Sequence, residues 1–355
     1  HEFELDADYF SGLILAKMGA RLEEAQSAIQ TLRYEKATST HPAKIDRLNE
    51  IERGWTKGNN YNKRINDTGI SEAMEPLIQE YYRKAKNGNA TAQNSLGYAY
   101  GEGKGVERDY KEAVKWYHKA AEQDNALGQF NLGTMYQNGY GVTKDYSEAV
   151  KWYRKAAEKG DVGGQYNLGF MYQLGHGIKK DHYEAVKWYL KAAHQGLAVG
   201  QNNLGFMYSN GYGVEKDNYE AVKWYRRAAE QGNAEGQDNL GNAYLAGKGV
   251  LKDGYEAAKW YRKAAEQGVG SSQSQLGLMY LTGTGIEKDD YEALKWLRKA
   301  AEKGNALGQY GLALMYKYGS GVEKDYDEAV KWYRKAARQG NENSKKQLTK
   351  MGESW

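Results

Sequence analysis

The sequence predicts an all-α protein, a right-handed αα-solenoid built from stacked helical hairpins. The dipeptide Leu-Gly returns every 36 residues, first as Leu96-Gly97 and then as Leu132-Gly133, and the series closes with Leu312-Ala313. A fixed period of this length is typical of solenoids, whose repeats bury themselves against their neighbours. Each period also contains two segments with helical spacing, separated by glycines. We therefore expect seven full repeats over residues 89–340.

The residues before the repeats divide into three segments. Residues 1–58 are helix-patterned but do not repeat, and the polar residues 59–72, with almost nothing to bury, read as a linker. Residues 73–88 resemble the second half of a repeat and are expected to cap the stack at its start. At the other end, residues 341–355 are expected to form a polar closing helix, with Leu348 at the Leu position of the repeat.

Residues 125–160 show how one repeat is expected to fold. Its first helix carries apolar side chains at spacings of three to five residues: Leu127, Leu132, Met135 and Tyr136. Gly139 and Gly141 then interrupt the helix, because glycine adopts backbone angles that a side chain forbids. Asp145 lies three residues before Glu148, the spacing of a capping box, and Gly160 is expected to end the second helix in the left-handed conformation.

Tryptophan and glutamine each return at one fixed position of every repeat. Tryptophans and glutamines fall at Trp116, Trp152, Trp188, Trp224, Trp260, Trp296, Trp332 and at Gln93, Gln129, Gln165, Gln201, Gln237, Gln273, Gln309. We interpret the tryptophans as core, since large rings supply the apolar area that thin repeats can bury. Buried amides need partners, so the glutamines predict a hydrogen-bond ladder between repeats. Gly133 should let the helices of one hairpin approach, and Ala156-Ala157 should let the next hairpin dock.

Composition narrows the class of protein. The 50 basic and 46 acidic side chains leave a net charge of +4 and are interspersed, a balance that does not indicate nucleic-acid binding. The chain has no cysteine, so disulfides and thiolate metal sites are excluded. No apolar run approaches the roughly 20 residues of a transmembrane helix. The first residue is His1 and not methionine, which leads us to expect preceding sequence.

The repeat pattern resembles the Sel1-like repeat family, which is related to tetratricopeptide repeats. The shared pattern is A-x-x-Q-x-x-L-G-x-M-Y-x-x-G-x-G-V-x-K-D-Y-x-E-A-V-K-W-Y-x-K-A-A-E-x-G, as read from Ala126 to Gly160, and it recurs over about three quarters of the chain. The resemblance implies a protein-binding scaffold in which the first helix of each repeat lines a concave face. The partner is then a protein or peptide.

Candidate binding residues lie where the repeats differ from one another. If the first helices face the partner, the positions two residues before and two residues after the repeated Leu matter most. Eight of the aromatic and amide side chains at these positions form the candidate set: Asn94, Tyr98, Phe130, Tyr166, Phe170, Asn202, Phe206 and Tyr310. They predict an apolar groove with amide donors, suited to an extended peptide or a helix. The alternative is that some of these rings pack between repeats.

Residues 1–58 resemble the C-terminal part of M48-type zinc metallopeptidases. An E-x-x-A-D segment spans Glu4 to Asp8, and an S-T-H-P element contains His41. The resemblance implies Glu4 as a zinc ligand, Asp8 as a residue that orients ligands, and His41 as a histidine near the metal. The family's H-E-x-x-H helix, which holds zinc and activates water, is absent, because Leu5 stands where its second histidine belongs.

Two functions from different classes therefore remain open. The chain is either an interaction scaffold without catalysis or cofactor, or the C-terminal portion of a zinc metallopeptidase whose catalytic helix lies upstream and whose repeats recruit substrate or partner. In the first case residues 1–58 are a helical remnant. Family analogy points to a bacterial cell envelope, and the sequence leaves the oligomeric state open.

Overall fold

The computed structural model describes residues 75–355, and over this range the chain forms sixteen α-helices and no strand. It divides into two compact parts at Asp161 and Val162, and each part is described by itself. Residues 1–74 lie outside the described range. The peptidase-like segment, the linker and the metal-site residues Glu4, Asp8 and His41 all fall there.

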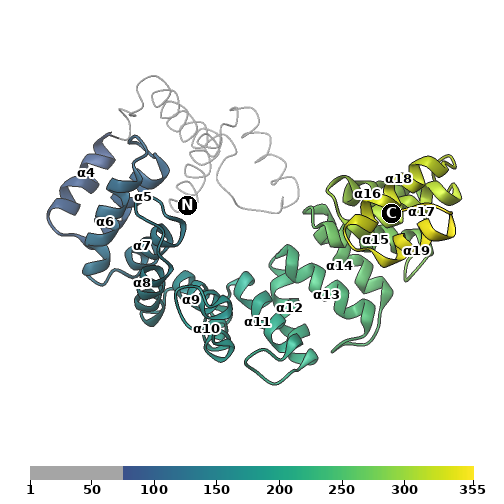
Figure 1. Ribbon diagram of the computed structural model, residues 1–355. Helices are drawn as coiled ribbons and strands as arrows, with labels where there is room; N and C mark the ends of the chain where they lie inside the picture. Colours follow the sequence, from purple (N-terminus) through teal and green to yellow (C-terminus); the bar gives the residue numbers. More distant parts are fainter. Residues whose placement is uncertain (1–74) are drawn as a thin grey trace, which may run out of the picture. The chain divides into compact units, whose positions relative to one another are not determined.

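In the N-terminal part, two helical hairpins follow a single helix (Figure 1). Helix α4 (Glu75–Lys86) packs on α5 (Ala90–Glu102), which pairs with α6 (Tyr110–Glu122). Helix α6 packs in turn on α7 (Ala126–Asn138), the partner of α8 (Tyr146–Glu158). Helix α4 therefore covers the first hairpin as the second helix of a repeat would.

The C-terminal part stacks five hairpins and a final helix in the same way (Figure 1). Its helices are α9 (Val162–Leu174), α10 (His182–His194), α11 (Ala198–Asn210), α12 (Asn218–Glu230), α13 (Ala234–Ala246), α14 (Gly254–Glu266), α15 (Gly270–Thr282), α16 (Asp290–Glu302), α17 (Ala306–Tyr318), α18 (Tyr326–Arg338) and α19 (Glu342–Lys350). Leu348 of α19 is fully buried, so the short polar helix covers the last hairpin with its one large apolar side chain.

Side chains and glycines fix the helix ends. Asp145 Oδ1 accepts hydrogen bonds from the N–H groups of Ser147 and Glu148, at 2.8 and 3.1 Å, which satisfies donors that the first turn leaves free. The expected capping box is only half formed. Glu148 pairs with Lys151, and the N–H of Asp145 donates to the Tyr136 carbonyl at 2.9 Å. The preceding helix thus satisfies the donor that a capping box would have engaged.

The small residues allow close packing at two kinds of contact. A Cβ added to Gly133 would lie 2.7 Å from Tyr153 Cδ1 of the other helix of its hairpin. A Cβ added to Gly128 would lie 2.7 Å from the Ala120 Cβ of the preceding hairpin. Real Cβ atoms do not approach so closely. The expected roles of the small residues within and between hairpins are therefore confirmed here.

The repeated glutamines form the expected ladder within each part. Gln237 is buried, and its Nε2 donates to the Ala229 carbonyl of the preceding hairpin at 3.2 Å. Its Oε1 accepts from Gln267 Nε2 at 2.8 Å, at the end of its own hairpin. Gln267 Nε2 also reaches the Gly232 carbonyl of the preceding hairpin at 3.0 Å. One amide therefore connects two hairpins and satisfies its own polar atoms.

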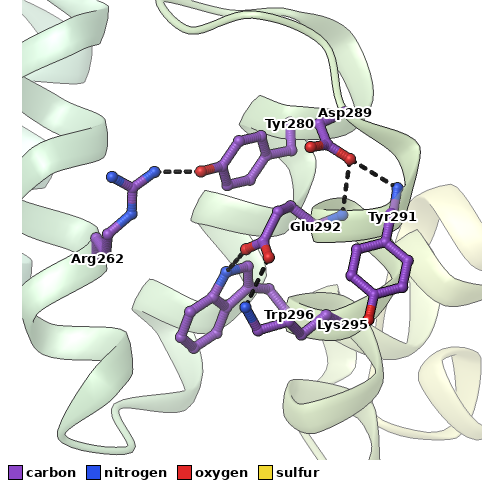
Figure 2. A network of polar contacts seen from close by, with 7 residues as sticks. All are labelled: Arg262, Tyr280, Asp289, Tyr291, Glu292, Lys295 and Trp296. Carbon is purple, nitrogen blue, oxygen red and sulfur yellow. Dashed lines mark hydrogen bonds and ion pairs between the residues drawn. The ribbon is translucent and has the colours of Figure 1, made fainter.

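The seven tryptophans of the repeats are buried, apart from the half-buried Trp332, as expected for core residues. A Lys or Arg three residues later lies over each ring, as Lys299 does over Trp296 at 4.7 Å from the centroid. Figure 2 shows the surroundings of Trp296, whose Nε1 donates to Glu292 Oε2 at 2.9 Å, while Lys295 donates to Oε1 of the same carboxylate at 2.6 Å. Asp289 caps this helix at the N–H of Glu292, so the carboxylate that binds the indole stands on a fixed first turn.

Candidate functional site

In the N-terminal part, the candidate residues lie on the first helices and are partly open to solvent. Tyr98 is 46% exposed, and Lys104 Nζ donates to its hydroxyl at 2.7 Å while lying over its ring. Asn94 Oδ1 accepts from Asn131 Nδ2 of the next first helix at 2.9 Å. Phe130 is half-buried, with its ring 6.0 Å from that of Tyr153. This surface presents one exposed ring, a cation and an amide.

In the C-terminal part, Tyr166 and Phe170 lie on one helix, α9, and stack on each other. Their ring centroids are 6.4 Å apart and nearly parallel, at 20°. Tyr166 also packs against the ring of Tyr189 at 5.7 Å, and Asn203 Nδ2 donates to its hydroxyl at 3.5 Å. Burial raises the pKa of the Tyr166 phenol. The Tyr166 ring is therefore fixed by its contact with Tyr189. Together with Phe170 it forms a short aromatic face on α9.

Phe206 lies in a second aromatic group, on α11 and the loop that follows it. It is 39% exposed, and its ring centroid is 5.9 Å from that of Tyr212, which is itself 41% exposed. Tyr212 in turn contacts His182 of the preceding hairpin at 5.0 Å. The sequence reasoning did not include Tyr212 and His182. The signal was present, because Tyr140 and Tyr110 occupy the same two positions and stack at 5.0 Å in the N-terminal part.

The two remaining candidates contact other described side chains, Asn202 in the next repeat and Tyr310 in its own hairpin. Asn202 Oδ1 accepts from Asn239 Nδ2 at 2.9 Å, the same arrangement that joins Asn94 to Asn131. Tyr310 packs on Tyr333 at 6.0 Å and belongs to the cluster that closes the chain's last hairpin. Packing between helices thus accounts for part of the Tyr310 ring. Among the described rings, Tyr310 contacts this cluster and none of the other candidate rings.

A second series of aromatic side chains, absent from the sequence reasoning, is more exposed than any candidate. It stands at the second position of four successive second helices in the C-terminal part: Tyr183 (69% exposed), Tyr219 (61%), Tyr255 (66%) and Tyr291 (75%). Their 36-residue spacing was visible in the sequence. We name these four residues the tyrosine series. Because they are so exposed, they are the alternative binding surface to the rings of the first helices.

The part of the chain that the structure describes contains neither a metal-binding group nor a membrane-spanning helix. Within residues 75–355 no group of three or more histidine, aspartate or glutamate side chains is placed to hold a metal ion. None of the described helices combines the length and apolar character that crossing a bilayer requires. The site is therefore a surface of rings, amides and a few cations.

A family model for the Sel1 repeat matches seven consecutive segments: 90–125, 126–161, 162–197, 198–233, 234–269, 270–305 and 306–341. The chain belongs to the Sel1 repeat family. The number of full repeats predicted from the Leu-Gly period is confirmed. No curated protein matches the chain significantly.

Solved Sel1 structures are similar to this chain. A protective antigen of uropathogenic Escherichia coli strains, described as displaying an SLR fold, is 38% identical over 77% of this chain and 67% of its own, with a TM-score of 0.63. A Sel1 repeat protein from Oxalobacter formigenes is 36% identical over 70% of this chain and 96% of its own, with a TM-score of 0.61. Both structures share the fold of this chain, and neither is described with a partner.

Sel1 repeat proteins are generally protein-interaction scaffolds, so the predicted class of function is confirmed at that level. The resemblance of residues 1–58 to a zinc metallopeptidase gains no support from these comparisons.

Proposed function

We propose that this Sel1 repeat chain binds a peptide or an extended protein segment on the face made by its first helices, the concave face that the tetratricopeptide relationship implies. The observation that carries the proposal is the exposure of Phe206 beside Tyr212 on α11 and its following loop. Two neighbouring rings open to water offer the large, rigid contact area on which interfaces depend. Both rings keep a large exposed fraction, although Tyr212 also contacts His182 of the preceding hairpin.

Fixed amides accompany these rings and suit a peptide backbone. Asn202 Oδ1 accepts a hydrogen bond from Asn239 Nδ2. The Nδ2 of Asn202 donates no hydrogen bond to any described residue. Asn94 is placed in the same way in the N-terminal part. A donor held by its own oxygen loses little side-chain freedom on binding a carbonyl, which favours recognition of main chain.

The test is selection of peptides from a random display library on the immobilised chain, followed by affinity measurements with variants. We expect Phe206→Ser and Phe170→Ser each to weaken the selected peptides at least about tenfold, the loss of a buried aromatic anchor. Tyr255→Ser, an exposed ring of the tyrosine series, is the matched control and should leave affinity unchanged. If the affinity of the peptides falls with Tyr255→Ser and not with Phe206→Ser, the binding site lies on the second helices and not on the first.

The second candidate function, the C-terminal portion of a zinc metallopeptidase, is carried by the E-x-x-A-D and S-T-H-P resemblance alone. It requires zinc held by Glu4 together with histidines upstream of this chain. Zinc content of the natural full-length product, compared with that of a Glu4→Gln variant, tests it. Equal and negligible zinc in both would remove this candidate and leave the scaffold.

A further inference from the structure

A pocket of about 390 Å³ lies in the C-terminal part and is lined by residues of α11, α12, α13 and α15 and of the loop after α13. Its floor is made of short apolar side chains, among them Ala221, Val222 and Ala243. Polar side chains line the rest of it: Ser209, Asn218, Tyr225, Asn239, Asn242, Lys248 and Gln275. The volume falls within the range of small-ligand sites, about 300–1,000 Å³.

Replacement of one methionine opens the floor of this pocket. Five repeats carry Met at the position of Ala243, namely Met135, Met171, Met207, Met279 and Met315. Met135 is buried in a cluster with Ala113 and Tyr117. One hundred and eight residues on, the equivalents Ala221 and Tyr225 are also buried in one cluster with Ala243, and all three line the pocket. The space that a methionine fills elsewhere is therefore available here, and it suits an apolar group of similar size.

Loss of a ring pair opens the rim. In the N-terminal part Tyr110 stacks on Tyr140, and in the C-terminal part His182 contacts Tyr212 in the same way. The next pair along the chain is Asn218 and Lys248, and both line the pocket. Where those repeats have two rings in contact, this repeat has an amide and an ammonium group.

The charge at the rim selects the ligand. Lys248 is the one charged residue that lines the pocket, and no described oxygen accepts a hydrogen bond from its Nζ. The nearest carboxylate along the helix, Asp238, is already engaged: one oxygen accepts from Asn242 at 3.1 Å and the other from Ser271 at 3.0 Å and from Ser272. An anion beside Lys248 would thus meet one unpaired cation, in a pocket that the amides of Asn218 and Gln275 also line.

We propose that this pocket binds a small apolar carboxylate, with its hydrocarbon group over Ala243 and its carboxylate at Lys248. The site is independent of the aromatic face in the proposed function, since it includes none of those rings. Two sources share this chemistry, a free organic acid and the C-terminal residue of a peptide.

The experiment titrates the full chain with hexanoate, with N-acetyl-leucine, with an acetylated Gly-Gly-Leu peptide, and with the amide of each, by calorimetry. We expect each acid that binds to do so at least about tenfold more tightly than its amide, because a charge-assisted hydrogen bond is lost. Comparable affinity of hexanoate and the peptide identifies free acids as the source, and a preference for the peptide identifies a C-terminus. Equal binding of acids and amides, or no binding, overturns the proposal.

Three variants locate the ligand. Ala243→Met restores the residue of five other repeats, so we expect it to fold, to be more stable to heat, and to lose binding at least about tenfold. Lys248→Gln should remove the preference for acid over amide. Lys252→Gln, an exposed lysine of the same loop that does not line the pocket, should keep it. Unchanged binding by Ala243→Met would show that the ligand binds elsewhere. Phe206→Ser should leave the affinity for the acids unchanged, whether or not the aromatic face binds a peptide.

Discussion

Gln267 Nε2 donates to Gln237 Oε1 over 2.8 Å, so the residue that ends one hairpin satisfies the amide buried inside it. The same pair recurs as Gln231 with Gln201 and as Gln339 with Gln309. It is missing where the terminal residue is lysine. Gln129 Oε1 and Gln273 Oε1 are buried without a hydrogen bond, and the residues thirty positions on are Lys159 and Lys303.

Lys303→Gln should therefore stabilise the C-terminal part by about 1 kcal/mol, because it supplies a donor to Gln273 Oε1. The existing bond from Lys303 to the Gly268 carbonyl, at 3.0 Å, need not be lost, since Gln267 makes the equivalent bond to Gly232. Urea denaturation measures the change. The control is Lys303→Met, which removes the ammonium group without adding an amide. A midpoint for Lys303→Gln no higher than that of Lys303→Met would contradict the prediction.

Two glycines of α5 should respond in opposite directions to alanine. A Cβ on Gly97 would lie 2.7 Å from Tyr117 Cδ1, whereas a Cβ on Gly101 would meet nothing closer than 3.7 Å. We expect Gly97→Ala to lower the free energy of unfolding by about 1–3 kcal/mol through overpacking. Gly101→Ala should raise it by about 0.5–1 kcal/mol through helix propensity.

The magnitude for Gly97→Ala should fall at the lower end of that range. Ala313 occupies the equivalent position in the chain's last repeat, so a hairpin can adjust to a methyl group there. Thermal melts of the two variants provide the comparison. Equal shifts in the same direction would show that contact with Tyr117 does not decide the outcome.

A missing helix cap can be restored at Val269. The first helices on either side begin with Asn233 and Asn305, whose Oδ1 atoms accept from the N–H three residues later at 2.7 and 2.9 Å. Val269 makes no such bond. Val269→Asn should stabilise α15 by about 1 kcal/mol relative to Val269→Ala, which removes the same apolar surface. Denaturation midpoints of the two variants test this, and indistinguishable values would show that the cap contributes nothing.

Buried tyrosines make the fold sensitive to alkali. Burial raises the pKa of Tyr225 to about 12 from its usual value of 10.0, and it also raises those of Tyr117, Tyr189 and Tyr261. A phenol whose pKa is higher in the folded state keeps its proton longer there than in the unfolded chain. Its stabilisation is therefore complete below pH 10 and declines as the pH rises toward 12 and beyond.

Circular dichroism and tyrosinate absorbance, followed together across this range, should change in one cooperative step. Tyr225→Phe removes one titrating phenol and should shift the step to higher pH. Tyrosinate that forms gradually while helicity is retained would show that the phenols ionise without unfolding.

The candidate site was predictable in part. Register in the sequence places Tyr98, Phe170 and Phe206 on one side of their helices, because an α-helix repeats its faces predictably. It does not say which rings a neighbour covers. Tyr166 and Tyr310 occupy the same repeat position as Phe130, and all three rings pack on the equivalent tyrosine of their own hairpin. Tyr166 also stacks on Phe170, and Tyr310 belongs to the cluster of the last hairpin. The partner tyrosine lies more than twenty positions along the chain, so spacing within one helix does not show how much of each ring it covers.

The sequence by itself determined the hairpin repeat, the helix ends and the buried series of Leu, Trp and Gln, because these follow from local spacing and from a period repeated seven times. The tertiary structure decided what each departure from the repeat does. Ala243, Asn218 and Lys248 are unremarkable one by one, and only packing of four helices makes them the floor and rim of one pocket. Cavities arise from volumes that neighbouring elements fail to fill, so they cannot be read from a single helix.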